Sequence, residues 1–248
     1  MKNISIIGSG NIATHLAIAL EKSIYQIYSR KIDNAKQLAE KVNAKFTNKI
    51  ENIKESNIII LCVPDNAIKE IILKINANKI IHTSGNTNIN IFNKKFDNYG
   101  VLYPVQTFNK NIKIDLFNVP ICIEANNSIF LDEINYISQS ISNHVVFMSS
   151  SKRRQLHIAA TFASNFSNQM FSIADDILNK SEIEFNILMP LIKQTIKKIN
   201  NNKPKKVLTG PAIRKDRETI KKHLESITNE EIKKIYKIIT QNIIKSNE

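Results

Sequence analysis

The first residues whose types and spacing could do chemistry are Gly8, Gly10 and Ala13, which form a G-x-G-x-x-A pattern. This pattern is typical of a loop that binds a dinucleotide. Gly8 would permit the tight turn, Gly10 would let the backbone approach a pyrophosphate, and Ala13 would allow close helix–strand packing. The pyrophosphate would then lie at a helix N-terminus, where N–H groups and the helix dipole favour an anion. The other residues of this candidate cofactor loop are Ser9, Asn11 and Ile12.

A second cofactor signal follows about 20 residues later, where an NAD-specific fold places an acidic residue on the ribose. This chain has Ser29 and Arg30 there, and no Asp or Glu occurs between Lys22 and Ile32. An arginine can bind a 2′-phosphate with two hydrogen bonds, whereas a carboxylate would repel it. We therefore expect Ser29 and Arg30 to bind NADP, although NAD stays open. In the alternative interpretation, Arg30 belongs to a solvated turn before the next helix.

The candidate catalytic residues lie on a helix predicted near 151–180. At 100° per residue, His157, Thr161, Ser164 and Asn168 form one stripe, with Asn165 at its edge. The stripe lacks the Lys and Glu side chains of a solvated face, so it indicates the wall of a site.

His157 is the candidate general acid and base, because imidazole gains and loses a proton near neutral pH. Ser164 and Asn165 would orient the substrate, and Thr161 would contact it. In the alternative interpretation, His157 is a hydrogen-bonded histidine between helices.

Two further segments supply candidate substrate contacts. Gln106 lies in the segment Tyr103–Phe108, directly after a predicted strand. Arg214 follows Gly210-Pro211 and could hold a carboxylate or phosphate, which would suit an anionic substrate. Alternatively, the Gly-Pro pair only ends one segment, and Asp216 caps the next helix. The two interpretations of this loop are compatible.

Alternating strands and helices must position these residues. The apolar runs predict strands at 4–7, 24–29, 57–63, 79–83, 99–102, 119–124 and 144–148. Helical patterns at 11–20 and 66–73 separate some of them. The ends of two of these strands would line the cofactor crevice, at Val63, Pro64, Asp65 and Ser84.

The C-terminal part has helical periodicity near 151–180, 182–200, 216–227 and 229–245, with no strand pattern. We therefore predict an α/β protein with a doubly wound Rossmann domain at 1–149. An all-α substrate or dimerisation domain would follow at 150–248.

The composition narrows the class of protein. A net charge of +13 invites a nucleic-acid partner, but the lysines are spread along the whole chain without interleaved aromatic residues, so we predict no such partner. No apolar run approaches the roughly 20 residues that cross a bilayer. Cys62 and Cys122 lie in strand-like runs, which favours buried thiols in a cytoplasmic protein. The five histidines show no spacing of paired ligands, so we predict no metal site.

Taken together, several segments carry a resemblance to a known family. They are the glycine loop, Val63–Asp65, Tyr103–Phe108, His157 with Ser164 and Asn165, and Leu208–Asp216. Their order resembles that of Rossmann-like proteins with a DUF2520 C-terminal domain. That family is similar to pyrroline-5-carboxylate reductase, F420-dependent NADP oxidoreductases and the 6-phosphogluconate dehydrogenase group.

The resemblance implies an NAD(P)-dependent oxidoreductase whose helical domain often pairs in a homodimer. Relatives often have His-Pro where this chain has Tyr103-Pro104, so a candidate acid is missing from that segment. The leading hypothesis is hydride transfer between NADP and a small carbonyl, imine or hydroxy substrate. The alternative hypothesis is a non-catalytic NADP-binding sensor that acts through a helical dimer.

Overall fold

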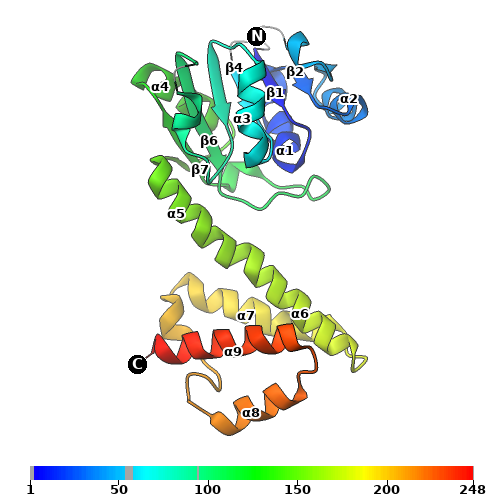
Figure 1. Ribbon diagram of the computed structural model, residues 1–248, viewed down its shortest axis with the longest axis vertical. Helices are drawn as coiled ribbons and strands as arrows, with labels where there is room; N and C mark the ends of the chain where they lie inside the picture. Colours follow the sequence, from blue (N-terminus) through cyan, green and yellow to red (C-terminus); the bar gives the residue numbers. More distant parts are fainter. Residues whose placement is uncertain (1–2, 54–57, 94, 248) are drawn as a thin grey trace. The chain divides into compact units, whose positions relative to one another are not determined.

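The computed structural model describes residues 3–53, 58–93 and 95–247. The chain divides into two compact units, Met1–Phe166 and Ser167–Glu248 (Figure 1). The first unit contains the sheet and the second consists of helices, which confirms the predicted fold class. The domain boundary expected after residue 149 stays a prediction. It precedes helix α5 (Ser150–Ala160), whereas the first compact unit extends through Phe166.

The first unit is built on a sheet with the strand order β3-β2-β1-β4-β5-β6-β7-β8. Neighbouring strands are parallel except for β6 and β7, which pair antiparallel. The strands are β1 (Ile4–Ile7), β2 (Ile24–Tyr28), β3 (Lys45–Thr47), β4 (Ile58–Leu61), β5 (Lys79–His82), β6 (Asn98–Pro104), β7 (Ile121–Ala125) and β8 (Val145–Phe147). The sequence analysis missed β3, and Asn57 of the predicted 57–63 strand lies outside the described residues.

Strands β1 and β4 lie side by side, and the predicted cofactor residues follow their carboxyl ends. All their residues are buried, because both faces of the sheet are covered, and this explains their continuous apolar runs. Ile7 pairs with Leu61, and the N–H of Cys62 donates to the carbonyl of Ile7 at 2.8 Å. The loops after β1 and β4 are therefore neighbours, at the point where the strand order reverses and ligands bind in such sheets.

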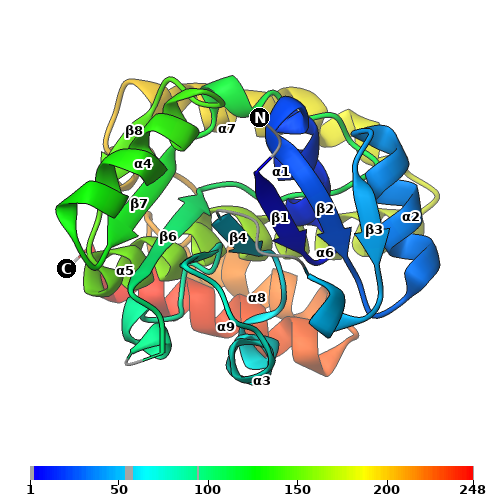
Figure 2. The ribbon, with the colours of Figure 1, turned by 90° about the horizontal axis from the view of Figure 1, so that it is seen from above.

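Helices cover both faces of the sheet (Figure 2). Helices α1 (Asn11–Ala19), α2 (Ile32–Lys41) and α4 (Ser128–Gln139) share one apolar core with the strands. Helix α3 (Asp65–Lys74) and the 3-10 turn η3 (Ile89–Phe92) contribute to the core on the other face. The small side chain of Ala13 is fully buried, as close packing of α1 on the sheet requires.

Helix α5 is fixed to the sheet by a buried ion pair that the sequence analysis missed. The side chain of Arg153 is fully buried, and its guanidinium contacts the Glu124 carboxylate on β7. Arg153 also donates to the Thr87 carbonyl at 2.6 Å, and Ser150 donates to Glu124 at 2.7 Å. An unpaired buried charge is costly, so this network sets the position of the first turn of α5.

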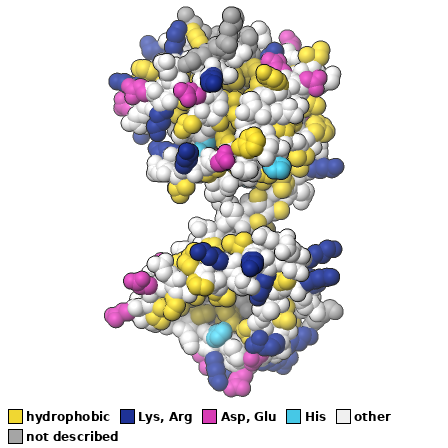
Figure 3. All heavy atoms as spheres, turned by 180° about the vertical axis from the view of Figure 1, so that it is seen from behind, with side chains coloured by type: hydrophobic (Ala, Val, Ile, Leu, Met, Phe, Trp, Pro, Cys, Tyr) yellow, Lys and Arg dark blue, Asp and Glu magenta, His cyan; other side chains and the backbone are white. Residues whose placement is uncertain are grey.

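The second unit contains α6 (Ser167–Asn179), α7 (Met189–Asn200), α8 (Arg217–Ser226) and α9 (Glu230–Lys245). These helices confirm the helical segments predicted from the sequence. Among the described residues of this unit, only Ala212 is buried. Large apolar side chains such as Leu191 and Ile238 are 64% and 65% exposed, and hydrophobic side chains are visible among the lysines and arginines (Figure 3). None of the helices described in the chain combines the length and apolar character that crossing a membrane requires.

Candidate cofactor and substrate sites

The glycine loop after β1 has the geometry that its sequence predicts. Gly8 has a φ of +124°, and a Cβ at this position would lie 2.1 Å from the carbonyl oxygen of Cys62. Only glycine fits this turn. A Cβ on Gly10 would meet no atom within 4 Å, so the loop surface is open there. Helix α1 has neither a side-chain cap nor an acidic residue in its first turn, which leaves its N-terminus suited to an anion.

A cavity of about 460 Å³ adjoins this loop. Seven of the predicted cofactor residues line it, namely Gly8, Ser9, Gly10, Ser29, Arg30, Val63 and Pro64. The other wall residues are Tyr28, Lys31, Asn34, Ile50, Cys62, Ala67, Glu70, Ile71 and Lys74. The cavity thus joins the open N-terminus of α1 to an apolar slot and a group of cations.

Of the charged side chains at the cavity, some form a salt bridge and others do not. Glu70 accepts from Lys74 at 2.5 Å, and this hydrogen bond lowers the pKa of the Glu70 carboxyl. Arg30 and Lys31 form no salt bridge with any described residue. The charge of Arg30 contributes to the lowered pKa of Glu70. Without a salt bridge of their own, both side chains can still approach an anionic group. Ser9 donates to the Ser29 hydroxyl at 2.9 Å, which joins the loops after β1 and β2.

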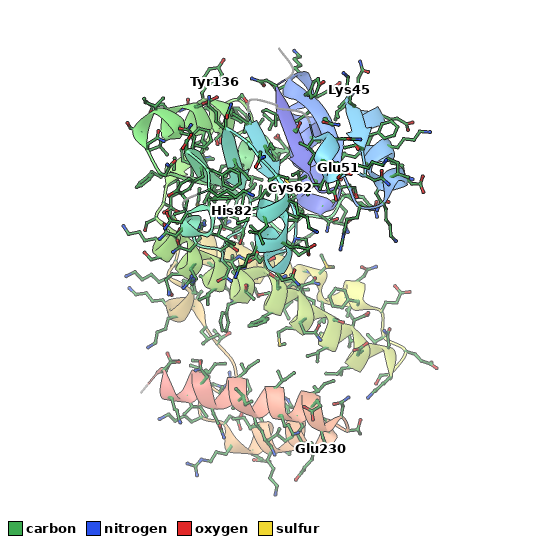
Figure 4. All side chains as sticks on the ribbon, turned by 45° about the horizontal axis from the view of Figure 1, so that its top comes forward. Lys45, Glu51, Cys62, His82, Tyr136 and Glu230 are labelled. Atoms are coloured by element: carbon green, nitrogen blue, oxygen red, sulfur yellow. The ribbon has the colours of Figure 1, made fainter. Side chains whose placement is uncertain are left out.

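The thiol of Cys62 lies at the wall of this cavity. Figure 4 labels Cys62 in the sheet-containing unit. Burial raises its pKa to about 12, so it stays protonated and unreactive at neutral pH. Cys122 is also buried and free, as the sequence predicted.

The remaining predicted cofactor residues lie outside the cavity wall. Asn11 accepts from the backbone N–H of Lys110 at 3.1 Å, and Asp65 begins α3. The hydroxyl of Ser84 accepts from the N–H groups of Asn86 and Thr87 at 3.1 and 2.8 Å, and so closes the turn after β5. Ile12 and Ala13 lie in the first turn of α1.

A second pocket of about 190 Å³ lies between the segment after β6 and α5. It brings together five predicted catalytic or substrate residues, namely Gln106, His157, Thr161, Ser164 and Asn165. Its other wall residues are Tyr103, Val105, Thr107, Ala160 and Ala163. Apart from the histidine, its polar side chains are hydroxyls and amides, which suit an uncharged polar group. The hydroxyls of Thr107 and Ser164 are 2.8 Å apart.

The shape of α5 corrects one detail of the predicted stripe. Residues Thr161–Phe166 form a π-helical turn (η5) rather than the straight α-helix assumed from the spacing. A π turn holds an extra residue, so it changes which side chains share a face beyond Thr161. Asn165 lines the pocket together with His157, whereas Asn168 does not. Such turns are frequent at functional sites.

The pocket also contains an interaction that the sequence analysis missed. The hydroxyl oxygen of Tyr103 lies 3.1 Å from Nδ1 of His157, with the rings edge to face. A Cβ on Gly85 would lie 2.7 Å from both the His157 Nδ1 and the Tyr103 Cζ. Gly85 therefore permits the close approach of three segments. The signal in the sequence was a glycine directly after a strand end, on the edge where ligands bind.

Arg214 belongs to the second unit, in a turn where Gly210 has a φ of +111°. Asp216 caps α8 by accepting from the Thr219 N–H at 3.0 Å, which confirms that interpretation of the loop. Asp216 also accepts from the Thr219 hydroxyl at 2.8 Å, and the two hydrogen bonds lower the pKa of its carboxyl. Among the described residues, no three His, Cys, Asp or Glu side chains are grouped to hold a metal ion.

Comparison with known families decides the membership of this chain. Residues 119–243 match the model of DUF2520, a domain of unknown function. The chain belongs to the DUF2520 family. Residues 3–83 of this DUF2520 protein match the family described as NADP oxidoreductase, coenzyme F420-dependent. The predicted resemblance is thereby confirmed. A comparison with the curated proteins finds no match.

Solved structures agree with the membership in the DUF2520 family. A Bacteroides fragilis protein described as a "putative NADP oxidoreductase" is 32% identical, with a TM-score of 0.91, and the match covers 98% of this chain and 97% of that one. A Thermotoga maritima protein is 22% identical, with a TM-score of 0.73 and 98% of both chains covered. A reductive aminase from Aspergillus terreus, in complex with NADPH and ethyl levulinate, is 15% identical. Its TM-score is 0.63, and the match covers 81% of this chain and 74% of that one, so it shares the fold.

Proposed function

We propose that this protein is an NADP-dependent oxidoreductase that transfers a hydride between NADP and a small carbonyl, imine or hydroxy compound. The observation that carries the proposal is the pair of sites in the first unit. One is an open glycine loop with an adjoining cavity, and the other is a polar pocket that contains His157. The similarity to the Bacteroides fragilis protein supports the reaction class. Reductive aminase, which shares the fold, was solved with NADPH.

The cofactor cavity fits the chemistry of NADP. The open surface at Gly10 and the uncapped N-terminus of α1 would hold the pyrophosphate. The apolar slot at Ile50, Ala67 and Ile71 would hold the adenine ring. Arg30, which has no salt-bridge partner among the described residues, would bind the 2′-phosphate. The charge of Lys74 offsets that of the nearby Glu70 carboxylate and so weakens its repulsion of that phosphate.

His157 would move the proton of the reaction. When bound, NADPH supplies a hydride, which carries two electrons to the substrate carbon. As an imidazolium, His157 would donate a proton to the oxygen or nitrogen that gains electron density and become neutral, and the neutral imidazole would accept that proton in the reverse direction. Ser164, Asn165 and Gln106 would orient that polar atom by hydrogen bonds, and Thr161 would contact the substrate. The role of Arg214 in holding an anionic group stays a prediction from the sequence, since Arg214 lies in the second unit.

The exposed apolar side chains of the helical unit support a homodimer. Leu191, Ile196 and Ile238 are more than half exposed, and a second copy of the chain would bury such side chains. The molar mass from light scattering tests this. The two free, buried thiols are compatible with the cytoplasmic location that we propose.

The cofactor proposal is tested by titrating NADPH and NADH and following nicotinamide fluorescence, since the chain has no tryptophan. The Arg30→Ala variant should bind NADPH about 10- to 100-fold more weakly, because charge-assisted hydrogen bonds contribute about 1.5–3 kcal/mol. Its affinity for NADH should stay near that of the wild type. Lys69→Ala, at an exposed position of α3 outside the cavity wall, is the matched control. Equal losses for both cofactors would contradict a 2′-phosphate contact.

The reaction is tested by the absorbance of NADPH during incubation with ketones, ketone–amine mixtures, imines and alcohols. We expect oxidation or reduction of the cofactor by one of these classes. His157→Gln should then reduce kcat by about 10²- to 10⁴-fold, which is the usual contribution of a general acid. Full activity of this variant would exclude the proposed role of His157. Cofactor binding without turnover across the panel would favour the regulatory alternative.

A further inference from the structure

The hydrogen bond between Tyr103 and His157 constrains the protons of the imidazole. A neutral imidazole carries a hydrogen on one ring nitrogen and accepts a hydrogen bond on the other. Nδ1 of His157 is the nitrogen that faces the Tyr103 hydroxyl, at 3.1 Å. Among the described residues, none forms a hydrogen bond with Nε2 of His157. Nδ1 therefore has the Tyr103 hydroxyl as its hydrogen-bond partner, whereas Nε2 is left to a ligand or solvent.

The environment of Tyr103 keeps its hydroxyl protonated, which makes it available as a hydrogen-bond donor. The side chain is only 6% exposed and packs with Ile89, Val101 and Cys122. Burial raises the pKa of the phenol, so it keeps its hydrogen at neutral pH. A phenol that keeps its hydrogen can donate it to an unprotonated Nδ1. If Nδ1 carried the hydrogen instead, the phenol would accept it, and the phenol's own hydrogen would have no partner among the described residues. The hydrogen of the neutral imidazole is therefore favoured on Nε2.

The close packing around the pair limits other orientations of the imidazole. The rings meet edge to face, with centroids 5.9 Å apart and an interplanar angle of 80°. Gly85 lies so close that a Cβ there would be 2.8 Å from the His157 Cγ. The ring therefore lies directly against Gly85, which limits its movement in that direction. Strand β6, the turn after β5 and helix α5 each contribute one of these three residues.

We propose that Tyr103 is a positioning residue that holds neutral His157 in the tautomer with its hydrogen on Nε2. Neutral His157 then offers Nε2–H to a substrate as a hydrogen-bond donor. When the histidine instead transfers that proton as an imidazolium, Nδ1 keeps the other hydrogen and donates it to the Tyr103 hydroxyl. The role of Nε2 in turnover rests on the proposed function, whereas the tautomer itself does not.

The protein contains a matched control for this interaction. In the helical unit, the Tyr236 hydroxyl lies 2.8 Å from Nδ1 of His223, with ring centroids 5.8 Å apart and an interplanar angle of 83°. This pair has nearly the same geometry, but His223 is exposed and lies outside the polar pocket. The Tyr236→Phe variant therefore removes the same atom from a comparable pair.

The tautomer is tested by long-range ¹H–¹⁵N spectra of the ¹⁵N-labelled full chain at about pH 9, where histidine is ordinarily neutral. The signals of His157 and His223 are assigned with the His157→Gln and His223→Gln variants. In the wild type we expect an unprotonated Nδ1 and a protonated Nε2 for His157. Tyr103→Phe should shift both nitrogens toward the values of a tautomer mixture. Tyr236→Phe should change His223 and leave His157 unaltered.

Two outcomes of the spectra would overturn the proposal. One is a protonated Nδ1 of His157 in the wild type, and the other is an unchanged His157 in Tyr103→Phe. Thermal melts of both phenylalanine variants check that they fold.

Once a substrate is found, Tyr103→Phe should lower kcat about tenfold and leave KM near its wild-type value. An unchanged kcat with an altered tautomer would refute the positioning role. A fixed tautomer with a fully active His157→Gln would instead refute only the proposed function.

Discussion

The two histidine–tyrosine pairs have nearly the same hydrogen-bond geometry and very different surroundings. His157 and Tyr103 come from segments 54 residues apart and meet beside a glycine, at a pocket of hydroxyls and amides. His223 and Tyr236 come from the successive helices α8 and α9, and His223 is exposed. A hydrogen bond between histidine and tyrosine therefore does not by itself indicate a catalytic site. The enclosure and the convergence of distant segments make the first pair a candidate for chemistry.

The two pairs also differ in how their helices are held. Helix α5 is fixed by Arg153, whose buried charge contacts Glu124 of β7. The comparable ion pair on α8 joins Glu218 and Lys222, 2.8 Å apart at positions i and i+4 of the same helix, and it is exposed. Buried ion pairs are costly to break, whereas exposed ones contribute little. The position of the His157–Tyr103 pair should therefore depend strongly on the Arg153–Glu124 ion pair. The His223–Tyr236 pair should depend little on the exposed ion pair of α8.

The largest effect is expected from Glu124→Gln. The substitution removes the negative charge and leaves the guanidinium of Arg153 buried without a counter-ion. We expect the free energy of unfolding to fall by about 3–5 kcal/mol, measured by urea denaturation. Loss of this anchor should also loosen the first turn of α5 and therefore weaken the contact between His157 and Tyr103. The ¹⁵N spectrum of His157 reports that second effect.

Glu218→Gln on α8 is the matched control, because it makes the same chemical change in an exposed ion pair. Its unfolding curve should coincide with that of the wild type within error. If the two variants were equally stable, the buried pair would not be the support that distinguishes α5 from α8.

The next effect concerns His82, which lies two residues before the Ser84–Gly85 turn (Figure 4). Its Nδ1 accepts from the Ser84 N–H at 3.2 Å, and its side chain is fully buried. Burial, with a smaller contribution from the charge of Arg153, lowers its pKa from 6.5 to about 3. Between these two values the unfolded chain binds more protons than the folded one. Stability should therefore fall as the pH falls through this window, by up to about 1.4 kcal/mol per pH unit from this group.

His82→Asn tests the pH effect, because asparagine can still accept from the Ser84 N–H but does not titrate. The dependence of unfolding free energy on pH should be shallower in this variant between pH 6.5 and about 3. Phe130→Leu is the control, since Phe130 is equally buried but belongs to the apolar core of α1, α2 and α4, away from His82. It should lower stability at every pH and leave the slope unchanged. Equal slopes in His82→Asn and the wild type would exclude His82 as the source of the pH effect.

The features that the sequence predicted depend on neighbours along the chain. Gly8 and Gly10 were identifiable because a tight turn and a helix follow one apolar run directly. The strands buried on both faces are continuous apolar runs, so β1 and β4 were clear. His157 was found because the polar stripe of its helix lacks charged residues. Each of these signals lies within about 20 residues of sequence.

The features that were missed join distant segments. Strand β3 has three residues, of which only Thr47 is buried, so it carries no apolar run. Glu124 and Arg153 are 29 residues apart, and no local pattern pairs them. The π turn at Thr161–Phe166 breaks the 100° periodicity from which the stripe was drawn. Tyr103 was identified only as a departure from relatives, because its partner His157 is 54 residues away.

The smallest of these effects on stability is expected from Gly85→Ala, which acts on the contact between the first pair directly. The new methyl group would lie 2.7 Å from the Tyr103 Cζ and the His157 Nδ1, so at least one ring must move. Such overpacking ordinarily costs about 1–3 kcal/mol, which a urea titration detects. The His157 tautomer should change as it does in Tyr103→Phe.

Gly10→Ala is the control, since its Cβ meets no atom within 4 Å. It should keep its stability but bind NADPH more weakly. A stable Gly85→Ala with the wild-type tautomer would mean that the enclosure around His157 yields to a methyl group. The two histidine–tyrosine pairs would then differ less than their surroundings indicate.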